Sequence, residues 1–226
     1  MILNIETSSK YCSVVVCHEG MVNFSLISDN EMDHASQLAP FVEKCFEELR
    51  RRDLSLDAVA VSMGPGSYTG LRIGLSLAKG LCFGLGIPLI GVPTLKQLAV
   101  KAMFSLPDLP DDVVFIPTVD ARRDEVYTAA YNLALEEVLP PQALILDAGS
   151  YSELAGKEKV FIGSGANKTE EIVGAPNSRY IFDMPVAADM TALSEKALRE
   201  KDFIDVAYST PFYLKNFMAT TPKKVL

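Results

Sequence analysis

The chain has 226 residues, of which 49% are hydrophobic and 22% are charged. Such a length suits one large or two small domains with a substantial core, and the composition excludes a disordered or fibrous protein. The 21 basic and 29 acidic residues give a net charge of −8. This charge is a poor match for a protein that holds nucleic acid by itself, because that task requires a basic surface.

The N-terminus and the apolar segments do not indicate secretion or membrane insertion. No basic stretch precedes the first apolar residues, and the longest uncharged apolar run, residues 80–95, is interrupted by Pro88 and Pro93. A spanning helix needs about 20 apolar residues. The four cysteines lack metal-ligand spacing and are expected to be reduced, buried thiols: Cys12, Cys17, Cys45 and Cys82. We therefore expect a cytoplasmic protein without membrane contact, bound metal or cofactor.

Apolar patterning in the first half predicts alternating strands and helices. Strands are expected at residues 2–6, 11–18, 21–28, 58–62 and 88–92. Helices are expected at residues 38–49, 69–85 and 94–104. Pro40 favours the first turn of its helix, which would leave residues 33–35 as a separate turn.

The second half repeats this order after a linker at residues 106–112, which contains two prolines and three acids. Strands are expected at residues 113–120, 125–132, 143–147 and 159–163, and helices at 150–155 and 191–200. The repetition predicts two α/β lobes built on one plan. We place the N-terminal lobe at residues 1–106, completed by 207–226, and the C-terminal lobe at residues 107–206.

A glycine-rich segment, residues 64–74 (GPGSYTGLRIG), joins a strand to the second helix. Backbone N–H groups at such a junction can bind an anion. A phosphate-binding P-loop would continue with Lys and Ser or Thr, whereas Leu71 follows Gly70 here. A tight turn with close packing is therefore the favoured interpretation.

The second helix is apolar nearly all round, with only a narrow polar stripe at Arg72, Ser76 and Lys79. Such a helix is buried on more than one side. One face can cover the sheet, and the other is expected to meet a second helix or a partner subunit. Burial wholly within the monomer is the alternative.

Polar residues at three places are candidates for a site. His34 is expected to form a hydrogen bond at the entry to the first helix, because the residue four positions later is Leu38, which cannot bind metal. Glu6 and Asp120 each end a predicted strand before a polar turn, where a catalytic base or phosphate contacts could lie. Residues 161–167 form a glycine-rich turn that permits close approach of a ligand.

Five elements of the sequence together resemble the TsaB family, also called YeaZ. They are residues 5–8, His34, residues 64–74, residues 119–127 and residues 211–215. The resemblance extends over nearly the whole chain, with Lys215 where the family usually has Arg. It implies an actin-like α/β fold (ASKHA, sugar kinase/Hsp70 type) of two related α/β lobes. It also implies a role in making threonylcarbamoyladenosine beside the anticodon of tRNAs that read ANN codons.

In that family the TsaB-like subunit is a non-catalytic scaffold. The resemblance implies pairing with the paralogue TsaD, which holds the metal and transfers the threonylcarbamoyl group, and with the ATPase TsaE. It also implies possible homodimers through the same first two helices, and tRNA contact only through the complex. Leu38 stands where TsaD requires its second metal-binding histidine. The interface residues expected on the two helices are Leu38, Phe41, Val42, Cys45, Leu71, Leu75, Lys79 and Cys82.

Nucleotide binding is expected to be weak or absent, because Glu6-Thr7-Ser8 replaces the Asp-x-Gly-Thr phosphate loop of active members of the fold. The residues that would contact a nucleotide are Glu6, Thr7, Ser8, Asp120, Arg122, Gly163 and Gly165. An ATP-dependent phosphotransferase with Glu6 or Asp120 as base is the alternative. The lack of a second ligand spaced from His34 argues against a metalloprotease. Near the C-terminus, Lys215, Lys223 and Lys224 are too few to anchor tRNA.

Overall fold

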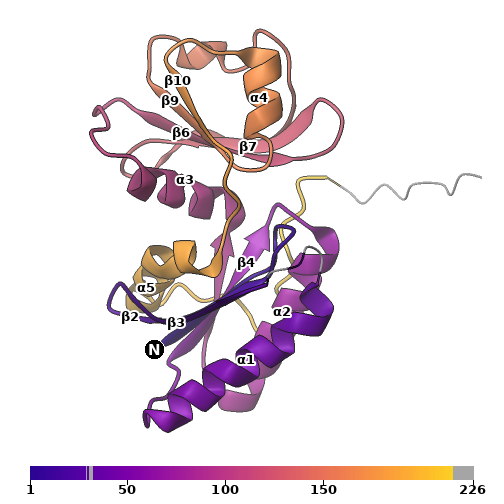
Figure 1. Cartoon of the computed structure of the whole chain (residues 1–226), viewed down its shortest axis with the longest axis vertical. Coiled ribbons are helices and arrows are strands. Elements are labelled where there is room, and N and C mark those ends of the chain that lie inside the picture. Colours follow the sequence, from indigo (N-terminus) through magenta and orange to yellow (C-terminus); the bar gives the residue numbers. More distant parts are fainter. Residues whose placement is uncertain (29, 31–32, 216–226) are drawn as a thin grey trace, which may run out of the picture.

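The computed structural model describes residues 1–28, 30 and 33–215, and within them the chain forms two five-stranded sheets (Figure 1). Lys223 and Lys224 lie outside the described residues. The first sheet has the order β3-β2-β1-β4-β5. Its strands are β1 (Ile2–Glu6), β2 (Ser13–His18), β3 (Met21–Ile27), β4 (Ala58–Gly64) and β5 (Leu89–Pro93). The central β1 is antiparallel to β2 and parallel to β4.

The second sheet repeats the plan of the first, with the order β10-β9-β6-β7-β8. Its strands are β6 (Val114–Asp120), β7 (Glu125–Tyr131), β8 (Glu137–Ile145), β9 (Lys159–Ile162) and β10 (Ser178–Ile181). The central β6 is antiparallel to β7 and parallel to β9, as β1 is to β2 and β4. The predicted pair of related α/β lobes is confirmed.

Helices cover both faces of the first sheet. On one face lie α1 (His34–Arg51) and α2 (Tyr68–Leu85), and α5 (Thr191–Glu200) lies on the other (Figure 1). The second sheet carries α3 (Thr94–Ser105) and α4 (Ala166–Val173). Two short 3₁₀ helices, η1 (Ser152–Leu154) and η2 (Ala187–Met190), complete the described elements. None of the helices in these residues is long and apolar enough to cross a membrane.

The two lobes exchange the helices that follow their last strands. Helix α3 follows β5 of the first sheet, yet Leu95 and Leu98 share a core with Phe115 of the second sheet. Residues 187–200, which we expected in the second lobe, pack instead on the first sheet, where Met190 contacts the cluster around Ile2. Helices α3 and α5 therefore each pack on the sheet of the other lobe and so connect the two lobes.

Helix α1 begins earlier than expected, at His34, and Pro40 lies inside it rather than in its first turn. A proline there removes the hydrogen bond to the carbonyl of Ser36. Both residues are exposed. Water can therefore solvate the freed carbonyl, and the buried face of the amphipathic helix stabilises the continuous segment.

Candidate functional site

A cleft of about 950 Å³ lies between the lobes. The loop after β1 and the start of α2 line it from the first lobe, and the turn between β6 and β7 lines it from the second. The C-terminal segment, residues 212–215, borders it as well. In both sheets, the edge at the carboxyl ends of the central strands faces the cleft. Such edges bring polar loop residues together.

On the first-lobe side, β1 ends in a fully buried carboxyl group, that of Glu6. Its Oε1 accepts a hydrogen bond from the backbone N–H of Ser8 at 2.5 Å. Burial raises the pKa of Glu6 above its ordinary value, and the hydrogen bonds from Ser8 oppose this. Ser8 lines the cleft, whereas Glu6 does not. The buried carboxyl group of Glu6 therefore stabilises the loop that follows β1.

The glycine-rich segment packs directly on this loop. A Cβ on Gly70 would lie 2.1 Å from the carbonyl oxygen of Thr7, and one on Gly74 would lie 2.3 Å from Thr7 Oγ1. A Cβ on Gly66 would lie 2.4 Å from the carbonyl oxygen of Ser8. Only glycine allows such approach. These contacts support the close-packing interpretation of the motif.

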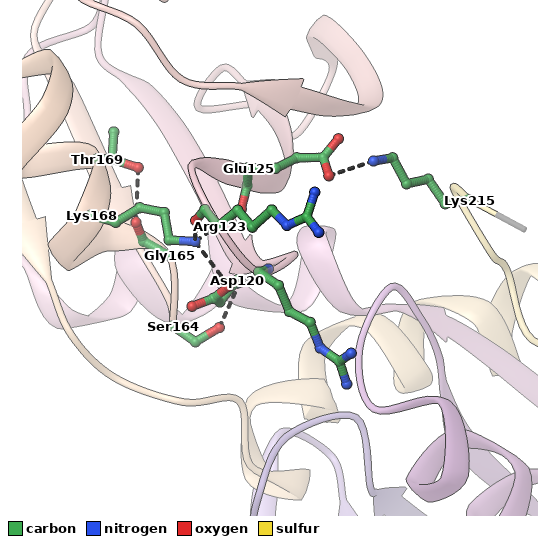
Figure 2. Close-up of polar contacts among 9 residues, drawn as sticks. Asp120, Arg123, Glu125, Ser164, Gly165, Lys168, Thr169 and Lys215 are labelled. Atoms are coloured by element: carbon green, nitrogen blue, oxygen red, sulfur yellow. Dashed lines mark hydrogen bonds and ion pairs between the residues drawn. The ribbon is translucent and has the colours of Figure 1, made fainter. Parts of the chain in front are cut away.

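On the second-lobe side, a hydrogen-bonded turn follows β6 (Figure 2). Asp120 Oδ1 accepts from the backbone N–H of Arg122 at 2.6 Å and from Lys168 Nζ at 3.0 Å. The backbone N–H of Asp120 in turn donates to Ser164 Oγ at 2.9 Å. Arg122 and Arg123 have φ values of 71° and 51°, in the left-handed region. Side-chain contacts therefore hold a strained turn at the cleft.

The C-terminal segment connects the two walls. The ring of Tyr213 lies 5.0 Å from that of Tyr68 at the start of α2, and its hydroxyl accepts from Arg72 Nε at 3.1 Å. Lys215 forms an ion pair with Glu125 of β7. Figure 2 shows Lys215 reaching Glu125 from the tail. Residues far apart in the sequence thus border one cleft.

The predicted nucleotide residues divide into two groups. Ser8, Asp120 and Arg122 line the cleft. Glu6, Thr7, Gly163 and Gly165 do not line it; they lie behind its walls, and both glycines pack on Thr118 of β6. The structure thus brings three of the predicted residues to one cavity.

Seven of the eight side chains predicted for the partner interface point into the first lobe and are not exposed for a partner to contact. They are Leu38, Phe41, Val42, Cys45, Leu71, Leu75 and Cys82, all buried. The eighth, Lys79, is partly exposed and donates to the carbonyl oxygen of Ala207 at 2.9 Å. The helical periodicity had identified the apolar stripe that faces the sheet, which is the ordinary role of such a stripe.

The exposed face of α2 carries different residues. Phe83 is 86% exposed, and a Cβ on Gly80 or Gly84 would meet no atom within 4 Å. Ser76 is also exposed. Small residues four apart, Ser76, Gly80 and Gly84, are the signal in the sequence that could have identified this face.

His34 takes the role expected of it: its Nε2 lies 2.9 Å from the carbonyl oxygen of Ser9. All four cysteines are free and buried. Across the part of the chain that the structure describes, no three His, Cys, Asp or Glu side chains come together as a group that could hold a metal ion.

Two lobes of one plan, each completed by a helix from the other and separated by a cleft, define an actin-like protein. The family model described as TsaD, tRNA N6-adenosine threonylcarbamoyltransferase, matches residues 28–224. The tRNA threonylcarbamoyladenosine biosynthesis protein TsaB of Escherichia coli is 30% identical, with 96% of each chain covered. TsaB of Bacillus subtilis is 31% identical, over 95% of this chain and 93% of that one.

Solved structures agree with these relatives. YeaZ from Pseudomonas aeruginosa is 28% identical and superposes with a TM-score of 0.76, over 94% of this chain and 99% of that one. A second structure from the same organism, described as similar to the peptidase YeaZ, has a TM-score of 0.77 over 95% and 99% of the two chains. The chain belongs to the TsaB family of tRNA threonylcarbamoyladenosine biosynthesis proteins.

Proposed function

We propose that this chain is a non-catalytic scaffold subunit in the biosynthesis of tRNA threonylcarbamoyladenosine. It pairs with a TsaD-like paralogue that transfers the threonylcarbamoyl group, a TsaE-like ATPase joins them, and the assembly works in the cytoplasm. Membership of the TsaB family supports the pathway. The surface of α2 supports the role of a partner subunit.

The observation that carries the proposal is the exposed face of α2. Phe83 is 86% exposed, although burying a Phe side chain is favourable by about 1.5–3 kcal/mol. Gly80 and Gly84 leave open space beside it, so that a second helix can approach its backbone closely. No acidic residue lies within α2. We infer that this face, with the neighbouring exposed face of α1, packs against equivalent helices of the paralogue, and in its absence against a second copy.

The carboxylates at the strand ends favour a scaffold over a catalyst. Glu6 is fully buried and does not line the cleft. Asp120 lines it, but Lys168 and the N–H of Arg122 occupy its Oδ1. Any nucleotide bound by this lobe pair would be held weakly, by Ser8, Asp120 and Arg122.

The test is co-elution with the TsaD-like protein of the same organism on sizing chromatography. We expect a stable complex with the native chain and none with Phe83→Asp or Gly80→Arg, because each places a charge or bulk at the proposed contact. Phe104→Asp is the matched control, since Phe104 is a 77% exposed aromatic residue on α3. Separate elution of the native proteins, or equal loss in the control, contradicts the proposal.

The second candidate is an ATP-dependent phosphotransferase, favoured by the position of Asp120 in the cleft. It predicts ATP turnover by the isolated chain that Asp120→Asn abolishes. The scaffold instead predicts no ATP turnover by the isolated chain, and loss of modification in a reconstituted tRNA modification assay when the whole subunit is omitted.

A further inference from the structure

Charged side chains of both signs line the cleft of this acidic protein. Four cationic side chains line it: Lys10, Arg122, Arg123 and Lys215. Three carboxylates line it as well, and two of them are neutralised, Asp120 by Lys168 and Glu125 by Lys215. No hydrogen bond or ion pair engages the guanidinium of Arg122 or Arg123 within the described residues. Two arginines are therefore available there to an anionic ligand.

The backbone of the turn that carries these arginines is held in place. Both adopt left-handed φ values, which cost about 1–3 kcal/mol each and persist only where surrounding contacts hold them. Lys168 supplies those contacts, because its Nζ donates to Asp120 Oδ1 and to the carbonyl oxygens of Arg123 and Glu125. Figure 2 shows Arg123 on the side of the turn where Lys215 approaches. Both arginine side chains are exposed on this turn, and an exposed guanidinium can form paired, charge-assisted hydrogen bonds with a phosphate.

A buried hydroxyl lies beneath the cleft lining. Thr94, at the start of α3, lines the cleft and is 1% exposed, and its hydroxyl oxygen has no hydrogen-bond partner among the described residues. A buried hydroxyl left unpaired costs free energy. Ser8 lines the cleft as well, but its side chain is hydrogen-bonded to Glu6.

Exposed aromatic side chains also line the cleft. Phe212 and Tyr213 are 48% and 37% exposed. Aromatic rings beside cationic groups are the usual surface for single-stranded nucleic acid, since bases stack on rings while phosphates meet the charges. Bases within a duplex are not accessible in this way.

We infer that the cleft and the adjoining tail bind a short segment of single-stranded RNA, with phosphate at Arg122 and Arg123 and a base against Tyr213. The choice of RNA rests on the proposed function. Two exposed rings, Phe212 and Tyr213, line the cleft together and can each stack on a base, so the ligand is a strand and not a single nucleotide. The net charge of −8 makes this contact local: it orients a strand and does not hold a whole tRNA.

The experiment measures fluorescence anisotropy of a labelled single-stranded oligoribonucleotide of about eight residues, a typical length for single-strand sites, with this chain alone. We expect Arg122→Ala/Arg123→Ala to weaken binding at least tenfold and to reduce the slope of log affinity against log salt by about 1.4, or about 0.7 per phosphate contact. Tyr213→Ala should weaken it about fivefold or more. Arg50→Ala/Arg51→Ala, at the end of α1, makes the same change in net charge and should leave affinity unchanged.

Three results overturn the inference. They are absence of RNA binding by the native chain, equal weakening by the Arg50/Arg51 control, and displacement of the RNA by ATP at lower concentration than by unlabelled oligoribonucleotide. Urea unfolding of each variant shows that a loss is not a folding defect. Because the assay needs no partner, failure here leaves co-elution with the TsaD-like protein unaffected, and failure of co-elution leaves the RNA result standing.

Discussion

The ammonium group of Lys168, on α4, lies 3.0 Å from Oδ1 of Asp120, at the end of β6. The same group donates to the carbonyl oxygens of Arg123 and Glu125. Three acceptors on one turn are therefore held by a residue from a different element. The backbone of the turn that carries the two arginines is therefore held by a lysine that does not line the cleft.

Replacing Lys168 should loosen the turn. Lys168→Met keeps the aliphatic stem but leaves the three acceptors without their donor, and hydrogen bonds to charged groups contribute about 1.5–3 kcal/mol. We expect the free energy of unfolding to fall by about 1–2 kcal/mol in urea titrations. Lys196→Met, which removes only the exposed pair with Glu200, should change it by less than about 0.5 kcal/mol. Equal effects would show that Lys168 acts only as surface charge.

Replacing Gly70 by alanine (Gly70→Ala) should destabilise the first lobe. An added Cβ would lie 2.1 Å from the carbonyl oxygen of Thr7, so α2 must shift away from β1, and overpacking of this kind costs about 1–3 kcal/mol or more. Gly80→Ala is the matched control in the same helix, because its Cβ would meet no atom within 4 Å. There the better helix propensity of Ala should raise stability by about 0.5–1 kcal/mol. Thermal unfolding of both variants distinguishes the two sites.

The carboxyl group of Glu6 should make stability depend on pH. Burial raises its pKa in the folded chain above the ordinary 4.5. The folded state therefore binds the carboxyl proton of Glu6 more tightly than the unfolded state does. The stability that this proton contributes is present below pH 4.5 and is lost as pH rises through the pKa of Glu6 in the folded chain.

Glu6→Gln retains an oxygen for the N–H of Ser8 and removes the charge. We expect the free energy of unfolding of this variant to increase relative to the native chain as pH is raised from 4.5 to 8. The difference between the two proteins isolates Glu6, because all other groups are shared. A difference that does not change with pH would contradict the prediction.

The thiols should be unreactive in the folded chain. Burial raises the pKa of Cys45 to about 12 and that of Cys82 to about 11, and it raises the pKa of Cys12 and Cys17 as well. The thiolate is the reactive form. At pH 8 we expect no rapid reaction with a disulfide reagent in the native state and modification of all four cysteines in guanidinium. Rapid native modification of any one would show that its region opens.

Local patterns predicted most of the elements. Apolar runs placed β1, β4 and β6 within one or two residues, because buried strands of a central sheet are continuously apolar. The eight-residue α4 and the strand β10 were not predicted, because residues 166–181 show neither a strong apolar stripe nor alternation. Pro40 misplaced the start of α1, since tertiary packing outweighed the local preference of proline.

The sequence by itself determined the two-lobe plan, the buried thiols and the close packing around Gly70, because each depends on residue types that are adjacent or regularly spaced. The outward face of α2 and the cleft were decided only by the tertiary structure. An apolar stripe has the same period whether it packs on a sheet or on a partner. In this fold the stripe with Leu71 and Leu75 is buried in the core. The net charge likewise hides the unpaired Arg122 and Arg123, because only folding pairs Asp120 with Lys168 and Glu125 with Lys215.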